Sequence, residues 1–445
     1  MKNNRRKFIS DTIKGTAALS IGSMLPSFSA ASYSRIMGAN DRLNVGMMGV
    51  NSRGLALAKA FAGQKNSQII SVSDVDSRAA EKCIGEVAKI TSNRATAVPD
   101  FRKALENKDL DILAIAAPDH WHAPAAILAA KAGKNVYVEK PCSHNPNEGE
   151  LLVKAALKHK TLIQMGSQRR SWPNVIEAIN QLHAGVIGRP YFAKTWYTNN
   201  RPSIGIGKEA AVPSWLDYDL WQGPAPRQAY KDNMIHYNWH WFWNWGTGEA
   251  LNNGVHMIDL ARWGLNAEFS TRVTSAGGRY RYKDDWQTPD TQVFTLEFNN
   301  NTSVAWEGRS CNGRNVEGAS VGCIFYGDTG SMFVDGNGYT IYDLDNKELK
   351  KVVDSNTEKG DLVSPAEHLD VIHIQNFLSA ITKGTRLNAH IAEGHKSTLL
   401  CQLGNIALRS GNALKTDPAN GHIIGDTAAQ QYWSRKYEPG WEPTV

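Results

Sequence analysis

The chain has 445 residues, which is long for one hydrophobic core, so we expect two domains with enough apolar residues for both. Its formal charge is +6, and residues 1–31, with five basic residues against one acidic residue, carry +4 of it and leave +2 for the remainder. A nearly neutral remainder without a basic stripe gives no electrostatic basis for binding nucleic acid.

Residues 1–31 have the pattern of an export signal. A basic start is followed by a short apolar stretch and by small residues near position 30. The apolar stretch is too short for a membrane span. The pair Arg5-Arg6 before Lys7-Phe8-Ile9 resembles a twin-arginine signal, whose machinery exports folded proteins with their cofactors. An ordinary secretory signal or an anchor is the alternative. We predict a periplasmic or otherwise exported protein without stable membrane insertion once the signal is cleaved.

The five cysteines are odd in number, widely spread and free of CxxC or Cys/His metal spacing. We expect mostly buried thiols, although Cys311 and Cys323 could pair in an oxidising compartment. His236 and His240 form no recognised metal pattern with a nearby acid, so the sequence predicts no catalytic metal.

From Leu43 onward, short apolar runs alternate with helical spacing. The runs are "LNVGMMGV", "SQIISVSDVD", "LDILAIAAP" and "KNVYVEKP". This alternation predicts a doubly wound parallel sheet over residues 41–165, with ligands at the carboxyl ends of its strands.

The turn after the first strand, Gly49-Val50-Asn51-Ser52-Arg53-Gly54, is a dinucleotide-binding fingerprint with Asn51 at the second glycine. Asparagine tolerates a left-handed backbone, so the turn can survive. The following helix start would hold pyrophosphate through Ser52, Arg53 and Gly54. Asp74, 20 residues after Gly54, would accept hydrogen bonds from a ribose, which favours NAD over NADP, although the nearby Arg78 weakens that preference.

Four later segments carry a family resemblance: "APDHWH" (117–122), "VEKP" (138–141), "NWGTGEALNNGVHMIDLARW" (244–263) and "EGHKSTLLCQLGNIALRSG" (393–411). With them the chain resembles the glucose-fructose oxidoreductase / inositol dehydrogenase family (Gfo/Idh/MocA). The resemblance implies an α/β protein in which a Rossmann domain precedes a C-terminal α/β domain, here 166–445, with an open, mostly antiparallel sheet. In the family, the sheet of the C-terminal domain often joins subunits, so the resemblance implies a homo-oligomer. Short β-rich runs separated by Gly, Asn and Asp agree with this sheet.

The resemblance also implies a catalytic pair, Lys140 at the nicotinamide and His256 facing it across the substrate. A base is needed for the hydroxyl proton, and either side chain can serve if its pKa suits the working pH. The alternatives are a solvated strand-end lysine and a hydrogen-bonded core histidine. Many polyol-oxidising relatives have an aspartate where this chain has Asn252, which can orient a hydroxyl but cannot accept its proton.

The remaining site predictions follow from position along the chain. In "HYNWHWFWNWG", tryptophans recur every second residue and could stack on a sugar or form a core. Arg169, in "GSQRR", is a pocket residue or a salt-bridge partner. We predict substrate contacts from Asn252, Arg169, Trp243 and His122, and further cofactor contacts from Ala117, Pro118, His120, Glu139 and Lys140.

These residues predict an exported oxidoreductase that uses retained NAD to act on a secondary hydroxyl of a sugar or glycoside. The alternative is an NAD-dependent glycosidase that oxidises, eliminates, adds water and reduces again with no net redox change. A sugar-binding module that has lost its chemistry is a third reading, which Lys140 and His256 argue against.

Overall fold

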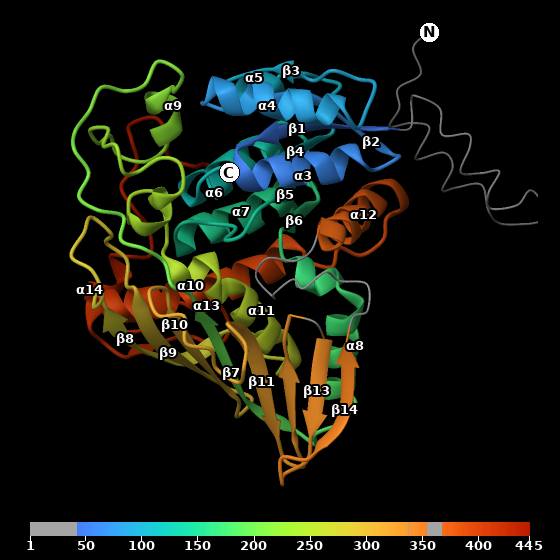
Figure 1. Ribbon diagram of the computed structural model, residues 1–445, viewed down its shortest axis with the longest axis vertical. Coiled ribbons are helices and arrows are strands. Elements are labelled where there is room, and N and C mark those ends of the chain that lie inside the picture. Colours follow the sequence, from blue (N-terminus) through green and yellow to red (C-terminus); the bar gives the residue numbers. More distant parts are fainter. Residues whose placement is uncertain (1–41, 337, 354–366) are drawn as a thin grey trace, which may run out of the picture. The chain divides into compact units, whose positions relative to one another are not determined.

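The structure, a computed structural model, describes residues 42–336, 338–353 and 367–445. The predicted export signal therefore lies outside the described residues. Residues Leu43–Val445 form one contact unit that contains two sheets and their helices (Figure 1). In the described ranges, no helix is both long and apolar enough to cross a bilayer.

The first sheet is parallel and has the order β3-β2-β1-β4-β5-β6. Its central strands are buried on both faces, as the continuous apolar runs predict. Its strands are β1 (Leu43–Met48), β2 (Ser67–Ser73), β3 (Thr96–Ala97), β4 (Ile112–Ile115), β5 (Asn135–Val138) and β6 (Ile163–Met165). The helices between them are α3 (Ser52–Ala62), α4 (Ser77–Ala88), α5 (Phe101–Leu105), α6 (Asp119–Lys131) and α7 (Pro146–His159). This is the predicted doubly wound Rossmann arrangement.

The second sheet has the order β14-β13-β12-β11-β7-β10-β9-β8-β15, and every neighbouring pair except β7 with β10 is antiparallel. Its strands are β7 (Pro190–Thr198), β8 (Ser270–Gly278), β9 (Thr291–Phe298), β10 (Ser303–Arg309), β11 (Val321–Gly327), β12 (Ser331–Val334), β13 (Gly338–Tyr342), β14 (Glu348–Val353) and β15 (Leu414–Lys415). Buried and more exposed residues alternate along β9 and β10, since one face packs on the core. The mostly antiparallel C-terminal sheet is confirmed.

The helices of this second part are η2 (Gln168–Ser171), α8 (Pro173–His183), α9 (Tyr218–Gln222), η3 (Asn238–Trp241), α10 (Glu249–Asn252), α11 (Gly254–Gly264), α12 (Glu367–Lys383), α13 (Ile391–Ser410) and α14 (Thr427–Gln430). In the chain, α12 follows strand β14 of the C-terminal sheet, yet its Ile374, Phe377 and Leu378 join the hydrophobic core that contains residues of α3. The two predicted domains are therefore bound together through a shared hydrophobic cluster.

A long connection between β7 and α10, residues 200–245, which we call the strap, builds a hydrophobic cluster of its own around Trp221 and Trp245. It reaches back to the loop after β2. There the Asp217 N–H donates to the Val75 carbonyl at 3.0 Å, and the Ser77 N–H donates to the Trp215 carbonyl at 3.1 Å. The strap thus spans from the second sheet to the carboxyl end of a Rossmann strand (Figure 1).

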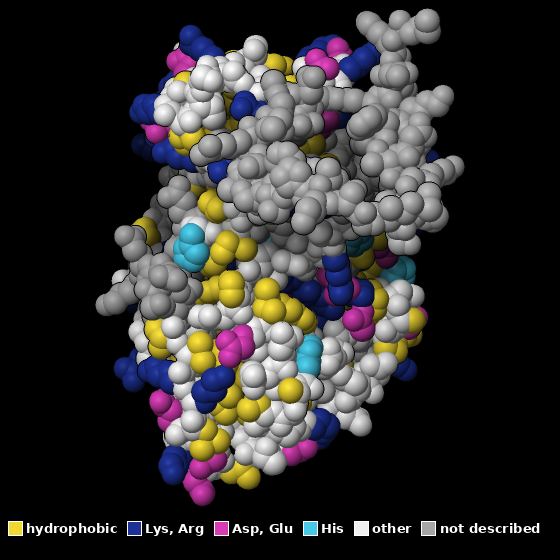
Figure 2. Space-filling model, turned by 90° about the vertical axis from the view of Figure 1, so that its right-hand side faces the viewer, with side chains coloured by type: hydrophobic (Ala, Val, Ile, Leu, Met, Phe, Trp, Pro, Cys, Tyr) yellow, Lys and Arg dark blue, Asp and Glu magenta, His cyan; other side chains and the backbone are white. Residues whose placement is uncertain are grey.

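All five cysteines are buried free thiols, so Cys311 and Cys323 do not pair as they could have done. Cys311 and Cys323 lie in separate hydrophobic clusters, Cys323 in the main C-terminal core and Cys311 beside Trp241 and Trp286. On the face shown in Figure 2, Lys and Arg side chains of the described residues are interspersed with acidic and uncharged side chains.

Candidate functional site

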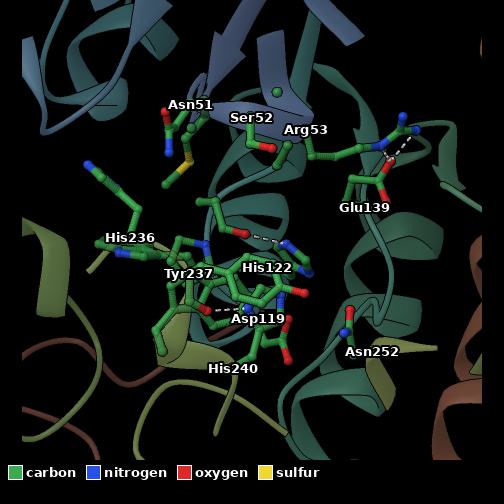
Figure 3. A pocket seen from close by; sticks show the side chains of 18 of the residues that line it. Asn51, Ser52, Arg53, Asp119, His122, Glu139, His236, Tyr237, His240 and Asn252 are labelled. Carbon is green, nitrogen blue, oxygen red and sulfur yellow. Dashed lines mark hydrogen bonds and ion pairs between the residues drawn. The ribbon is translucent and has the colours of Figure 1, made fainter. Parts of the chain in front are cut away.

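A cavity of about 840 Å³ runs from the fingerprint turn to the start of α11. Fingerprint residues, the ends of β2, β4 and β5, and residues of the strap line it. Figure 3 shows Asn51, Ser52 and Arg53 on one side and Asn252 with Tyr237 and His240 on the other. The cavity therefore lies at the carboxyl edge of the parallel sheet, where a Rossmann fold binds its ligands.

The fingerprint turn requires its first and last glycines. Gly49 has φ +75°, and a Cβ there would lie 2.6 Å from the Ala117 nitrogen. A Cβ on Gly54 would lie 1.8 Å from the Gly49 oxygen, so only glycine allows α3 to start this close to β1. Asn51, at the second glycine position of the fingerprint, has φ −66° and so does not adopt a left-handed backbone. A residue with a side chain therefore causes no backbone strain at this position.

The start of α3 offers unpaired donors. No side chain caps this helix and its first turn has no acid, while the first helical bond runs from the Leu55 N–H to the Asn51 carbonyl. The N–H groups of Ser52, Arg53 and Gly54 precede that bond, so they have no partner within the helix. Such a helix start favours an anionic group such as a pyrophosphate.

Asp74 directly follows β2 and lines the same cavity. Its carboxylate accepts from the Val50 N–H at 2.6 Å and the Asp76 N–H at 2.9 Å. Burial raises the pKa of Asp74, and these hydrogen bonds act against that rise. Arg78 does not line the cavity, because its guanidinium pairs with Asp76 at 2.8 Å and stacks on Trp215.

Arg53 reaches sideways to two carboxylates. Its guanidinium lies 2.8 Å from Glu139 and 2.6 Å from Asp370 of α12. Burial acts to raise the pKa of Glu139, but Arg53 holds it below its usual range. Arg53 and Glu139 both line the cavity as predicted for cofactor contacts, yet their charged groups also fix the end of β5 to α3 and α12.

Lys140 follows Glu139 and points to α10. Its Nζ donates to the Asn252 backbone oxygen at 2.6 Å and to Asn252 Oδ1 at 3.1 Å. Burial lowers the pKa of Lys140, and the charges of Glu139 and Asp119 offset part of that effect. The lysine is therefore a positioned, partly buried amine, which contradicts the solvated strand-end alternative.

His256 lies in the first turns of α11, and its side chain lines the cavity that Lys140 also lines. Its Nδ1 is buried without a hydrogen-bond partner, so it is not the hydrogen-bonded core histidine of the alternative reading. Burial, and then the charge of Arg169, holds the pKa of His256 well below its usual value. His256 is thus neutral at ordinary pH, with one ring nitrogen left for a ligand or water.

The strap and β7 supply a wall that the sequence did not reveal. Arg201 donates to Glu249 at 2.9 Å and to the Tyr237 hydroxyl at 2.6 Å, and Tyr197 and His240 lie beside them. Burial lowers the pKa of His240 to about 3. No short motif marks Arg201 or Tyr197, since the strap folds back by packing contacts between distant segments.

Two of the residues predicted to contact a ligand, His120 and His122, have both ring nitrogens close to backbone oxygens. His120 is buried outside the cavity, with its ring nitrogens at 3.3 and 3.0 Å from backbone oxygens of Trp245 and Trp221. Burial lowers its pKa to about 3. His122 does line the cavity, but both ring nitrogens lie 2.6 Å from backbone oxygens and so are already engaged. Both histidines therefore support the backbone rather than offer a free ring nitrogen to cofactor or substrate.

Arg169 and Trp243 also fall outside the cavity. Arg169 is buried in η2, where it influences His256 through charge, while its neighbour Arg170 pairs with the buried Asp259 at 2.8 Å. Trp243 lines a different cavity, described below. Of the alternating tryptophans, Trp241 and Trp245 are core residues, and Trp239 lines the cavity.

The residues present fit a dinucleotide. The donors of the α3 start suit phosphates and Asp74 suits a ribose, with Ala117 and Pro118 alongside. Nothing among the described residues groups three or more His, Cys, Asp or Glu side chains in a way that could hold a metal ion.

Two family signatures match this chain. "Oxidoreductase family, NAD-binding Rossmann fold" covers residues 43–167, and "Oxidoreductase family, C-terminal alpha/beta domain" covers residues 216–411. The chain belongs to the Gfo/Idh/MocA oxidoreductase family. The matched ranges contain the fingerprint, Lys140 and His256.

Similar proteins of this family have varied names. A glycosyl hydrolase family 109 protein of Saccharopolyspora erythraea is 25% identical over 52% of this chain and 55% of its own length. An inositol 2-dehydrogenase of Rubrobacter xylanophilus is 26% identical over 41% and 52%. A levoglucosan dehydrogenase of Pseudarthrobacter phenanthrenivorans is 30% identical over 33% and 38%. The chain spans about half, or less, of the length of these curated relatives.

Solved structures extend the likeness of fold over most of the chain. A levoglucosan dehydrogenase in complex with NADH and levoglucosan superposes with a TM-score of 0.64 at 18% identity, covering 84% of this chain and 99% of the other. An aldose-aldose oxidoreductase from Caulobacter crescentus, complexed with glycerol, gives a TM-score of 0.64 at 17% identity with the same coverage. At these identities the likeness shows the fold alone.

Proposed function

We propose that this protein is an NAD-dependent oxidoreductase acting on a secondary hydroxyl of a sugar or glycoside. The observation that carries the proposal is one cavity with a dinucleotide-binding turn at one end and Lys140 with His256 at the other. The printed names of the relatives, inositol 2-dehydrogenase and levoglucosan dehydrogenase, support a polyol or sugar as the substrate class.

When bound, the nicotinamide cofactor supplies the acceptor for a hydride from the carbinol carbon. The protein then has to remove the hydroxyl proton. Lys140 serves as the base, because burial lowers its pKa and so raises the fraction of free amine. Asn252 fixes the lysine through two oxygens at 2.6 and 3.1 Å but cannot itself take a proton. His256, neutral and with a buried unpaired Nδ1, orients the substrate hydroxyl or relays its proton.

A second candidate is a glycosidase with no net redox change, which the glycosyl hydrolase family 109 names among the relatives favour. In that cycle the sugar carbon is oxidised, the neighbouring C–H becomes acidic, and the glycosidic oxygen leaves by elimination. Water then adds to the double bond, and the carbon is reduced again. Lys140 and His256 would act on protons in both reactions.

We also propose that the protein retains its cofactor through turnover. The strap supports this retention, because the strap crosses to the loop after Asp74, where His236 Nε2 lies 2.9 Å from Asp76. Burial acts to raise the pKa of Asp76, but bonds from Arg78 and His236 hold it at about 2, so the carboxylate stays charged across ordinary pH. A strap fastened beside the ribose-binding carboxylate opposes release of a dinucleotide.

Export and oligomerisation are further parts of this proposal. The basic, then apolar, pattern of residues 1–31 supports export, and a protein outside the cytoplasm has no free NAD pool to draw on. The family resemblance implies that the second sheet joins subunits, so we propose a homo-oligomer.

A saccharide panel offered to the protein purified with its own cofactor tests the proposal. A lasting change in nicotinamide absorbance with intact glycosidic bonds supports the oxidoreductase, and cleavage without a lasting change supports the glycosidase. A denatured supernatant that contains no nicotinamide dinucleotide would count against a retained cofactor.

A further inference from the structure

A second cavity lies apart from the first and shares no lining residue with it. Its volume is about 400 Å³, and it is formed by the start of α7, residues 243–251, α13 and the chain after α14. Small-molecule sites occupy roughly 300–1,000 Å³, so the space suits a ligand the size of a single sugar.

Buried polar atoms without partners gather around this cavity. Four of its lining residues each carry one such side-chain nitrogen or oxygen: His144, Gln402, Asn405 and Arg435. A buried polar group that makes no hydrogen bond is costly, so most are paired in folded proteins. Their concentration at one cavity indicates that a polar ligand belongs there.

Two of these side chains have a fixed orientation because their other end is already bonded. Gln402 donates from Nε2 to the Ser143 carbonyl at 3.1 Å, and Asn405 donates from Nδ2 to the Thr247 carbonyl at 2.8 Å. Their free atoms are therefore acceptors.

The other two orphan atoms complete a mixed set. Arg435 donates Nε to Glu148 at 2.9 Å and leaves Nη1 as a charged donor. His144 Nε2 lies 3.0 Å from the Trp243 carbonyl, so Nε2 carries the proton and Nδ1 is an acceptor. Hydroxyl groups both donate and accept, and a polyhydroxy ligand matches such a set.

The charges of the lining residues favour an anionic ligand. The lining includes Arg409, Arg435 and Lys436 and contains no aspartate or glutamate. Glu148, which lies just outside the lining, pairs with Arg435. Arg409 has no carboxylate partner among the described residues and lies 4.5 Å from the Trp243 ring and 4.1 Å from the Tyr432 ring.

We propose that this second cavity binds a small hydroxylated carboxylate, a sugar acid such as a hexuronate. Its carboxylate pairs with Arg409 and Lys436, and its hydroxyls bond to Gln402 and Asn405. The site is independent of the proposed oxidoreductase site, so either proposal can fail without the other.

Calorimetric titration of D-glucuronate into the full-length protein with its cofactor tests this proposal. The titrated protein carries Lys140→Met, which prevents turnover in the first cavity. Arg409→Met and Lys436→Met are added separately, and both side chains are exposed, so the fold should persist. Arg272→Met removes an exposed arginine from β8, outside the second cavity, as the matched control.

We expect saturable binding that weakens about tenfold to a hundredfold in Arg409→Met, because a charge-assisted hydrogen bond is lost. Lys436→Met should weaken it in the same direction, and Arg272→Met should leave it unchanged. D-Glucose and inorganic phosphate should each bind more weakly than D-glucuronate. Absence of saturable binding, binding that neither cavity variant changes, or phosphate binding as tight as D-glucuronate would each overturn the proposal.

Discussion

Replacing Lys140 by methionine removes the amine while keeping most of the side-chain stem. The amine is held by two Asn252 oxygens at 2.6 and 3.1 Å, and burial lowers its pKa. Loss of a positioned general base typically reduces kcat by about 10²–10⁴. That range corresponds to roughly 3–5 kcal/mol in the activation free energy.

The assay is kcat and KM for the best saccharide of the panel, followed as nicotinamide absorbance across a pH series. The amine is free above its pKa, so kcat of the unmodified protein should rise with pH and level off above the pKa of Lys140. Lys140→Met should lose that rise and keep its cofactor, while Lys103→Met, on the exposed side of α5, should behave as wild type. A loss below about tenfold, or an unchanged pH profile, would refute Lys140 as the base.

Three further changes test other parts of the account. Asn252→Asp puts a carboxylate where Oδ1 now lies 3.1 Å from the lysine ammonium, so the lysine pKa should rise by about 1–3 units. The rising limb of the pH–rate profile should then move to higher pH, and an unmoved limb would contradict the contact. Asp259→Asn leaves Arg170 buried without its partner and should lower the free energy of unfolding by about 3–5 kcal/mol, measured by denaturant titration. His236→Ala removes the bond to Asp76 and should speed cofactor release, measured by nicotinamide fluorescence on dilution. An unchanged release rate would show that this strap contact does not retain the cofactor.

The local part of the site could be predicted from the sequence. The fingerprint turn, Asp74 and Lys140 occur at strand ends, and strand ends follow from short-range apolar patterns. These residues line one cavity because parallel strands end at one edge of the sheet, and His256 of α11 lines the same cavity from the C-terminal part.

The strap could not be predicted in the same way. Arg201 and Tyr237 meet Glu249 only because residues 200–245 fold across the cavity, and that path depends on packing between distant segments. The same limit applies to His120 and His122. Their position after a strand end predicts ligand contacts. In the structure, backbone oxygens of residues up to 125 positions away in the chain lie against the His120 ring. Backbone oxygens of residues closer in the chain lie against the His122 ring.

The most direct test of hydride transfer in this cavity uses a sugar deuterated at its carbinol carbons. The protein purified with its own cofactor is mixed with the substrate that the panel identifies, and the nicotinamide dinucleotide released on denaturation is analysed by mass spectrometry. The account predicts deuterium in the reduced cofactor of the unmodified protein and much less in Lys140→Met at the same reaction time. Conversion of the sugar with no deuterium reaching the cofactor would contradict it.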